Sequence, residues 1–306
     1  MKIDTHIHST YSDGTSSVKE IVKDAKSKNL ALISLTDHNT FNGIEDLRKY
    51  SKENGVRAIA GIEISTTYFG EDVHVLGYYN INTNFNDSRY DIVKDCYKVY
   101  VNGKKEQLKK IVENISKDEN VSVDEFEEFV TANATSSNIN RVIVAKYLVS
   151  KKIVSSINEA FDKFINTKSK YYVEIPQANA MDAIRAIVIS GGIPVVAHLG
   201  LDKFSDDNDM LTKFFDEISL ITNSVGIELF HFNHDDSKID QLIEFTKNYK
   251  DLEFFFSAGS DYHGLNKSNE IGTPWEDVSE KHKNLYEEIS RDFINLLEDK
   301  GYLERA

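Results

Sequence analysis

The first thirteen residues, MKIDTHIHSTYSD (1–13), decide how the rest of the chain is interpreted. Residues 1–5 are predicted to form a short strand, and His6 and His8 follow at its end. Because side chains two residues apart on a strand point to the same side, both imidazoles can bind one ion. Asp13 lies in a Ser/Asp/Gly turn and can fold back toward the same point. Imidazoles with a nearby carboxylate suit Zn, Fe or Mn, so this stretch predicts part of a metal site.

The composition limits the classes of protein that this chain can belong to. Its 306 residues can bury a full core, as one large α/β domain or as one domain with an insertion. The net charge of −14, from 36 basic and 50 acidic residues, argues against a long duplex nucleic acid as partner, because such binding needs many Lys and Arg to neutralise phosphates. A small phosphorylated ligand stays compatible, since metal ions can meet its charge locally. Cys96 is the only cysteine, so no intrachain disulfide and no zinc-thiolate site is expected.

The sequence also bears on where the protein resides. No apolar run approaches membrane-spanning length. The N-terminus does not show the basic segment and apolar stretch of a signal peptide. We therefore expect a cytoplasmic protein that does not bind a membrane, and the oligomeric state stays open.

Seven apolar strands recur along the chain and mostly alternate with helices. They are predicted at residues 1–5, 30–35, 56–65, 72–79, 193–197, 225–230 and 252–257. This alternation implies a parallel sheet covered by helices. Between residues 85 and 176 the strand-like runs stop and several helices are predicted, which exceeds an ordinary crossover. We expect an α/β domain made of residues 1–84 and 177–306, and an all-helical insertion domain at 85–176.

Histidines and acids follow these strands in a regular way. Six of the seven strands place one at or just past the C-terminal end, and the fourth carries His74 near its start. The candidate metal ligands are His6, His8, Asp13, His38, Glu63, His74, His198, Asp261 and His263. In barrel folds the active site lies where the C-terminal strand ends converge, whereas an open doubly wound sheet binds ligands at one switch point. The spread of ligands favours a closed or nearly closed barrel.

Each of these residues also has a structural interpretation when it is taken singly. His74 or His198 alone is more typical of a hydrogen-bonded core histidine than of a ligand, and Glu63 alone could be half of a buried ion pair. Their recurrence at strand ends favours a joint metal site. His282, in the predicted last helix at residues 279–299, is expected to be an ordinary surface histidine.

The motifs resemble those of the PHP (polymerase and histidinol phosphatase) superfamily. The matching motifs are His6-x-His8, Ser12-Asp13-Gly14-Thr15, Thr36-Asp37-His38, Gly61-Ile62-Glu63, Ala197-His198 and Gly259-Ser260-Asp261-x-His263. The resemblance implies a distorted seven-stranded (β/α) barrel of TIM-like form, with three divalent ions per chain (Mn²⁺, Fe²⁺ or Zn²⁺). It also implies three ligand sets: His6, His8, Glu63 and Asp261; Glu63, His74 and His198; and Asp13, His38 and His263.

The predicted insertion resembles that of stand-alone phosphoesterases that act on nucleoside 3′,5′-bisphosphates and 5′-phosphorylated oligonucleotides. Asn140-Arg141, Ala145-Lys146-Tyr147-Leu148 and Glu159-Ala160-Phe161 are similar to a segment of those enzymes. The chain departs from that segment at Val142-Ile143, where Pro-His is usual.

The chemistry implied is phosphate-ester hydrolysis by a metal-activated hydroxide, without a covalent phospho-enzyme. The expected catalytic residues are Glu63, Asp261, His263 and His231, and the expected substrate-binding residues are Arg141, His231 and His234. A guanidinium fork suits a second phosphate, although a structural hydrogen bond is an equally open role for Arg141, His231 and His234. Asp37 is expected to orient a ligand histidine.

We expect a metal-dependent phosphoric ester hydrolase whose partner is a small phosphorylated nucleotide or a short oligonucleotide. The predicted reaction converts nucleoside 3′,5′-bisphosphates to nucleoside 5′-monophosphates or trims short 5′-phosphorylated oligonucleotides. The alternatives are a histidinol-phosphate phosphatase and, from another class, a non-catalytic metal-binding regulatory module.

Overall fold

The computed structural model describes residues 1–133, 140–201 and 203–304, and the chain divides into two compact units. The first unit comprises Met1–Tyr97 and Ala178–Ala306, and the second comprises Lys98–Gln177. Each unit has a buried apolar core of its own. No helix in the described ranges is long and apolar enough to cross a membrane.

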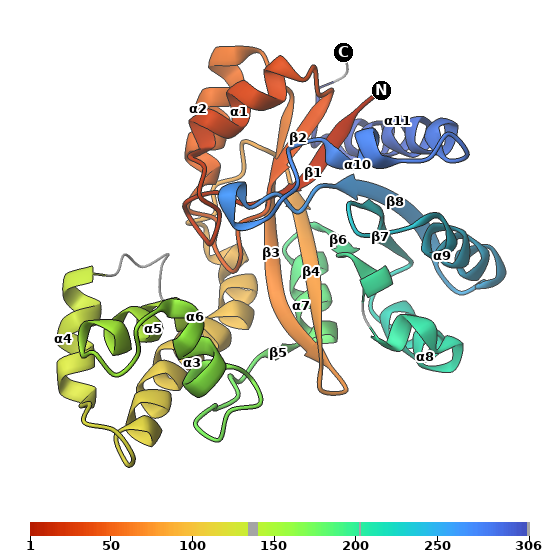
Figure 1. Cartoon of the computed structure of the whole chain (residues 1–306). Helices are drawn as coiled ribbons and strands as arrows, with labels where there is room; N and C mark the ends of the chain where they lie inside the picture. Colours follow the sequence, from red (N-terminus) through yellow and green to blue (C-terminus); the bar gives the residue numbers. More distant parts are fainter. Residues whose placement is uncertain (134–139, 202, 305–306) are drawn as a thin grey trace. The chain divides into compact units, whose positions relative to one another are not determined.

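The first unit is an α/β fold built on one curled, half-barrel sheet (Figure 1). Its strands are β1 (Ile3–Ile7), β2 (Leu32–Leu35), β3 (Ala58–Tyr68), β4 (Glu71–Tyr79), β5 (Ala178–Asn179), β6 (Ile193–Val196), β7 (Ser224–His231) and β8 (Glu253–Gly259). The strands lie in the order β1-β2-β3-β4-β6-β7-β8, and β5 pairs with β3. Its helices are α1 (Val18–Ser27), α2 (Ile44–Asn54), α7 (Ala180–Ile189), α8 (Asn208–Ser219), α9 (Asp236–Asn248), α10 (Thr273–Asp277) and α11 (Lys283–Asp299). Short 3-10 turns lie at Ser88–Tyr90, Leu199–Leu201, Lys203–Asp206 and Gly264–Asn266.

The second unit is formed by helices that pack around their own core. The long helix α3 (Asp91–Ile115) begins in the first unit and continues into the second. It is followed by α4 (Val123–Asn133), α5 (Arg141–Ser150), α6 (Ile157–Ala160) and a π-helix at Phe161–Ile165. Leu108, Phe126 and Tyr147 are among the buried side chains of this core.

The strands of the first unit are apolar along most of their length because helices cover the outer face and side chains fill the inner one. Every residue of β1, β2 and β6 is buried. Burying one such aliphatic side chain contributes roughly 1.5–3 kcal/mol. Helix α1 begins at a capping box in which Ser17 and Glu20 satisfy each other's backbone amides.

The first and last strands approach each other just beyond their C-terminal ends. Ile7 forms a parallel bridge with Tyr262, and the His8 amide donates to the Tyr262 carbonyl at 2.9 Å. Thr5 Oγ1 donates to the Ala258 carbonyl at 3.1 Å. The segments that follow β1 and β8, which carry predicted ligands, are therefore neighbours.

The expectation of an all-parallel sheet is wrong at one strand. Strand β4 pairs antiparallel with both β3 and β6. Phe69 and Gly70, with φ of 49° and 82°, make the two-residue turn between β3 and β4, and so short a turn can join only antiparallel neighbours. Because β4 runs backward, its first residues lie beside the end of β3, with His74 opposite Ser65. The position of His74 near the start of its strand therefore brings it to the same edge as the other candidates.

The last helix also differs from the expectation. Helix α11 begins at Lys283, and His282 is its N-cap residue and is only 4% exposed. The His282 ring nitrogens lie 2.9 Å from Asp236 Oδ1 and 3.0 Å from Asp240 Oδ1, both on α9. The prediction of a surface histidine is wrong, because this ring connects two helices.

Candidate metal centre

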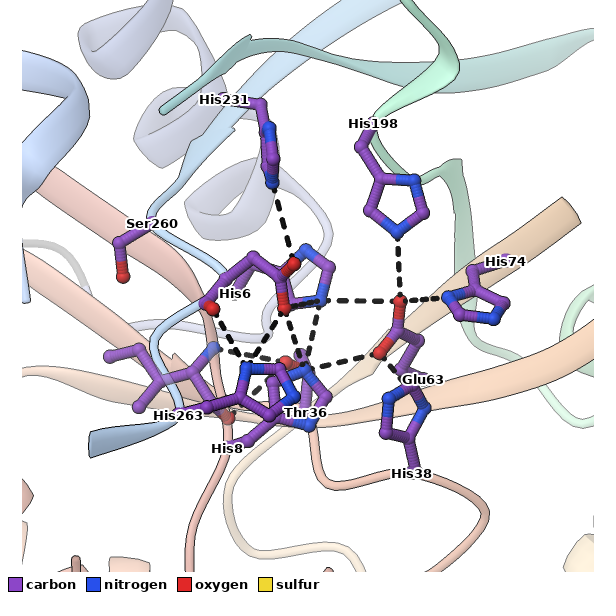
Figure 2. A network of polar contacts seen from close by, with 12 residues as sticks. His6, His8, Thr36, His38, Glu63, His74, His198, His231, Ser260 and His263 are labelled. Atoms are coloured by element: carbon purple, nitrogen blue, oxygen red, sulfur yellow. Dashed lines mark hydrogen bonds and ion pairs between the residues drawn. The ribbon is translucent and has the colours of Figure 1, made fainter. Parts of the chain in front are cut away.

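Nine side chains that can bind metal converge at one edge of the sheet in the first unit. They are His6 on β1, His8 and Asp13 after it, His38 after β2, Glu63 on β3, His74 on β4, His198 after β6, and Asp261 and His263 after β8. Figure 2 shows the histidine rings gathered around the Glu63 carboxylate. The ligand atoms of eight of them form three overlapping groups, and within each group all of these atoms lie within 4.8 Å of one another. His198 is in none of the three groups, but its Nε2 lies 3.3 Å from Glu63 Oε1. The groups are His6, His8, Glu63 and Asp261; His8, Asp13, His38 and His263; and His38, Glu63 and His74.

Glu63 lies at the centre of this arrangement, and its side chain is 1% exposed. Its Oε1 lies 2.8 Å from His74 Nδ1 and 3.3 Å from Nε2 of both His6 and His198. Burial by itself raises the pKa of the Glu63 carboxyl, but the charges of the surrounding histidines lower it well below its usual value. Glu63 is therefore an ionised carboxylate that can bridge ions.

The second oxygen of Glu63 faces two other histidines. Its Oε2 lies 3.0 Å from His38 Nδ1 and 3.1 Å from His8 Nε2. Although so close, Glu63 Oε2 and His38 Nδ1 are buried and have no hydrogen-bond partner among the described residues. Burial lowers the pKa of His38 to about 3, which outweighs the opposing effect of nearby carboxylates. A neutral imidazole nitrogen and a carboxylate oxygen left unsatisfied in this way fit the role of ligands to a shared cation.

The first group has the spacing of ligands around one ion. Nε2 of His6 lies 3.1 Å from Nε2 of His8, and these atoms lie 3.6 Å and 3.3 Å from Asp261 Oδ1. Nitrogen and oxygen ligands at about 2.1 Å from an ion are roughly 3.0–3.4 Å from one another. The donor set of two imidazoles and two carboxylates suits Mn²⁺, Fe²⁺ or Zn²⁺. The residues present therefore fit a bound metal.

Asp13 completes the second group from the turn after β1. Its Oδ1 lies 3.2 Å from His263 Nε2 and 3.6 Å from His8 Nδ1, and its Oδ2 lies 3.9 Å from His38 Nε2. Burial raises the pKa of Asp13, but the hydrogen bond with His263 and the charge of His8 contribute to holding it well below its usual range. Both oxygens are thus available to cations.

Asp37 shapes the turn that carries Asp13. Asp37 Oδ1 accepts from the Ser9 amide at 2.8 Å and from Ser12 Oγ at 2.6 Å, and Oδ2 accepts from Ser9 Oγ at 2.8 Å. Asp37 reaches a histidine less directly than expected. Ser12 Oγ, which donates to Asp37, lies 3.5 Å from His8 Nδ1 and so connects the two side chains.

Asp261 connects the metal-binding groups to two further donors. Its Oδ1 faces His6 and His8, whereas its Oδ2 lies 3.5 Å from His231 Nε2 and forms an ion pair with Lys267. Burial raises the pKa of Asp261, but the His6 charge and the His231 hydrogen bond contribute to holding it far below its usual value. Sequence reasoning missed Lys267, although a cation soon after a ligand-bearing strand end is a usable signal.

His231 and His234 lie at different depths. His231 is 3% exposed, and its Nδ1 accepts from the Asn233 amide at 3.2 Å, so its proton is on Nε2, toward Asp261. His234 donates from Nδ1 to the Leu229 carbonyl at 2.8 Å, and burial lowers its pKa to about 4. Both line a cavity of about 450 Å³. Its other lining residues are Phe230, Phe232, Asp235, Asp236, Ser237, Ile239, Pro274, Asp277, Val278 and Ser279.

Arg141 belongs to the second unit and has structural contacts there. Its Nη1 donates to the Ile165 carbonyl at 3.0 Å, and the guanidinium lies 5.8 Å and 5.5 Å from the ring centroids of Phe161 and Tyr172. These contacts hold the π-helix to α5. A substrate contact of Arg141 stays a prediction.

Comparison with known proteins bears directly on this centre. Residues 4–303 match the family described as the PHP domain. The chain belongs to the PHP domain family. PHP membership confirms the resemblance in the motifs and makes the protein a metal-dependent hydrolase of phosphate esters.

Relatives of this PHP protein are named for several different activities. It is 30% identical over 197 residues to a 5′-3′ exoribonuclease of Haemophilus influenzae, covering 64% of this chain and 68% of that one. It is 24% identical over 261 residues to a 3′,5′-nucleoside bisphosphate phosphatase of Chromobacterium violaceum, covering 85% and 87%. It is also 24% identical over 264 residues to a phosphoribosyl 1,2-cyclic phosphate 1,2-diphosphodiesterase of Eggerthella lenta, covering 85% and 94%. Among solved structures, an amidohydrolase from Chromobacterium violaceum has the same fold, with a TM-score of 0.71, 21% identity and coverage of 95% and 96%.

Proposed function

We propose that this PHP protein hydrolyses nucleoside 3′,5′-bisphosphates to nucleoside 5′-monophosphates and trims short 5′-phosphorylated oligonucleotides. The observation that carries the proposal is the convergence of five imidazoles on the buried carboxylate of Glu63, flanked by Asp13 and Asp261. So many nitrogen and oxygen ligands around one bridging carboxylate suit a cluster of cations that binds a phosphate. Two relatives, a 5′-3′ exoribonuclease and a 3′,5′-nucleoside bisphosphate phosphatase, support a nucleotide as the substrate.

The proposed centre holds three divalent ions, Mn²⁺, Fe²⁺ or Zn²⁺. The proposed ligand sets are His6, His8, Glu63 and Asp261; Glu63, His74 and His198; and Asp13, His38 and His263. When bound, such ions supply an activated water and stabilise the charge that develops on the phosphoryl oxygens.

Side chains beside the ligands position the phosphate ester. Lys267 has a side chain that is 33% exposed and pairs with Asp261, so its ammonium can also contact a phosphoryl oxygen. His231 carries its proton on Nε2, next to Asp261, and can donate a hydrogen bond from it to an oxygen of the phosphate ester.

The cavity that His231 shares supports a nucleoside as the leaving group. Phe232 and Pro274 offer apolar surface to a base, and the described lining residues include carboxylates but no Lys or Arg. A carboxylate favours the amino and hydroxyl groups of a nucleoside over a second phosphate. For that phosphate the proposed contact is the guanidinium of Arg141, as its resemblance motif implies.

Turnover by the metal-loaded protein on a substrate panel tests the proposal. The panel contains a nucleoside 3′,5′-bisphosphate, a 5′-phosphorylated trinucleotide, histidinol phosphate, a ribosyl 1,2-cyclic phosphate and an aryl phosphate. We expect the bisphosphate to have the highest kcat/KM. Preferred cleavage of histidinol phosphate or of the cyclic phosphate would instead establish one of the other two activities and refute ours.

Arg141→Ala, with Arg141→Lys as its charge-retaining partner, tests the second phosphate. Losing a charge-assisted contact costs about 1.5–3 kcal/mol, or roughly ten- to a hundredfold in kcat/KM. The loss should occur on the bisphosphate and be much smaller on the aryl phosphate. Equal losses on both substrates would mean that Arg141 serves only the fold of its own unit.

A further inference from the structure

We propose that Glu228 is a positioning residue that aligns two metal-binding histidines at once, His6 through its ring and His198 through its backbone. The inference rests on the proposed metal site. Glu228 lies within the apolar strand β7 and is not among the site residues that the sequence predicts.

Glu228 is a fully buried carboxylate, at 0% exposure. Its Oε1 lies 2.9 Å from His6 Nδ1, and its Oε2 accepts from the His198 amide at 2.8 Å. A buried carboxylate is costly unless it is paired, so these two donors account for its presence inside the fold.

The contact with His6 decides which ring nitrogen binds metal. An ionised carboxylate can only accept, so Nδ1 of His6 carries a proton and Nε2 is left as the ligand atom. That Nε2 lies 3.3 Å from Glu63 Oε1 and 3.6 Å from Asp261 Oδ1. Glu228 therefore sets both the tautomer and the direction of this ring.

The contact with His198 holds an uncommon backbone conformation. His198 has a φ of 31°, in the left-handed region that residues other than glycine rarely adopt. Its amide is held by Glu228, and from this conformation His198 Nε2 lies 3.3 Å from Glu63 Oε1. One carboxylate on β7 thus fixes a ligand on β1 and another after β6.

The neighbouring strand leaves room for this contact. A Cβ added at Gly259, the last residue of β8, would lie 2.5 Å from Glu228 Oε1 and 2.2 Å from His6 Cβ. Both distances are too short for carbon contacts, so a glycine at this position allows His6 and Glu228 to meet.

Replacing the carboxylate by an amide cannot satisfy both histidines. After Glu228→Gln, one position accepts and the other donates. If the amide oxygen faces the His198 amide, the NH₂ group meets His6 Nδ1 and favours a proton on Nε2, which blocks the ligand atom. If the oxygen faces His6, two N–H donors meet at His198. One of the two ligands is misaligned in either case.

Asp4→Asn is the matched control. Asp4 is also 0% exposed, and it accepts from the Ser260 amide at 2.9 Å, from the Gly272 amide at 2.7 Å and, at 3.4 Å, from the backbone amide of His6. Each variant therefore replaces a buried carboxylate that accepts from backbone amides by an amide, and only Glu228→Gln also changes the partner of an imidazole ring nitrogen.

The experiment measures Zn²⁺ affinity by competition with a chromophoric chelator, together with ¹⁵N NMR of the zinc-loaded protein. We expect Glu228→Gln to bind zinc about 10–100-fold more weakly and to lose the hydrogen-bonded Nδ1–H signal of His6, while Asp4→Asn stays within about threefold of wild type. Unchanged affinity and an unchanged His6 signal in Glu228→Gln would overturn the proposal. So would equal losses in the two variants.

If Glu228→Gln does not fold, Glu228→Asp serves in its place. It keeps the charge but is one methylene shorter, so we expect it to keep one of the two contacts and to show a partial loss of affinity. Full retention would overturn the proposal. These readouts need no substrate, so a failed substrate panel would refute the proposed reaction and leave this result unaffected.

Discussion

Replacing Glu63 by Gln is the sharpest test of the centre, because Glu63 is a proposed ligand of two of the three ions. Oε1 lies within 3.3 Å of His6, His74 and His198, and Oε2 lies within 3.1 Å of His8 and His38. The substitution keeps the size of the side chain but replaces one oxygen by an NH₂ group, which cannot bind a metal. Two of the three ligand groups contain Glu63, so one substitution should weaken more than one ion.

The size of the effect can be bounded from below. Loss of a residue that only supports a metal ligand typically costs 10–100-fold in affinity, about 1.4–2.8 kcal/mol at 1.4 kcal/mol per tenfold. Loss of a carboxylate that binds the metal directly should reduce the affinity by at least as much for each ion that the carboxylate bridges. We therefore expect roughly 10²–10⁴-fold in the combined affinity for two ions, and hydrolysis should fall below detection.

Elemental analysis after dialysis against buffered Mn²⁺ measures the number of ions retained. Glu63→Gln should lose two or more equivalents, whereas Asp13→Asn, which removes a ligand of one proposed ion, should lose one. Glu217→Gln is the control and should retain every ion. Within the described ranges, the hydrogen bond that Glu217 accepts comes from Tyr68 Oη at 3.1 Å and involves no proposed metal ligand. If Glu63→Gln and Asp13→Asn lost the same single equivalent, Glu63 would not be a bridge.

Three further outcomes follow from the described contacts. His282→Ala should lower Tm by about 2–4 °C in a thermal melt and leave kcat/KM unchanged, and an unchanged Tm would contradict the buried pairing with α9. Lys267→Ala should lower kcat/KM on phosphate esters by roughly ten- to a hundredfold, with Lys267→Arg recovering most of it, and equal defects in both variants would place Lys267 in the fold. Burial lowers the pKa of His234 to about 4, whereas an unfolded histidine has a pKa of about 6.5. As the pH drops from about 6.5 to 4, His234 is protonated in the unfolded chain before it is protonated in the folded one. The free energy of unfolding therefore falls over this range, by on the order of 3 kcal/mol. His234→Asn, which can still donate to the Leu229 carbonyl, should remove that component of the pH dependence. The measurement is the free energy of unfolding from urea titrations of chelator-treated protein at several pH values. If it fell equally steeply with pH in wild type and variant, His234 would not be its source.

The sequence by itself determined the family and the kinds of side chain at the strand ends. His6 and His8 could be related to each other because a strand places residues two apart on one side. Val18, Ile21, Val22 and Ala25 form the buried stripe of α1 as their spacing predicts. Such local periods are properties of the backbone, so they can be recognised before any tertiary contact is known.

The direction of β4 depended on tertiary structure. Its apolar sequence is compatible with either direction, because a strand buried on both faces carries no pattern that distinguishes them. The short turn at Phe69-Gly70 decided the direction and thereby placed His74 opposite Ser65.

The same limit applies to the polar residues that sequence analysis assigned incorrectly or left without a role. His282 looked exposed because its partners, Asp236 and Asp240, lie more than forty residues earlier in the chain. Glu228 gains its role from His6 and His198, which come from other strands. Lys267 follows the same strand as its partner Asp261, so only its contact had to await the folded structure. The partners of a buried charge are set by which strand ends meet in space, and that meeting is a property of the folded sheet rather than of any segment.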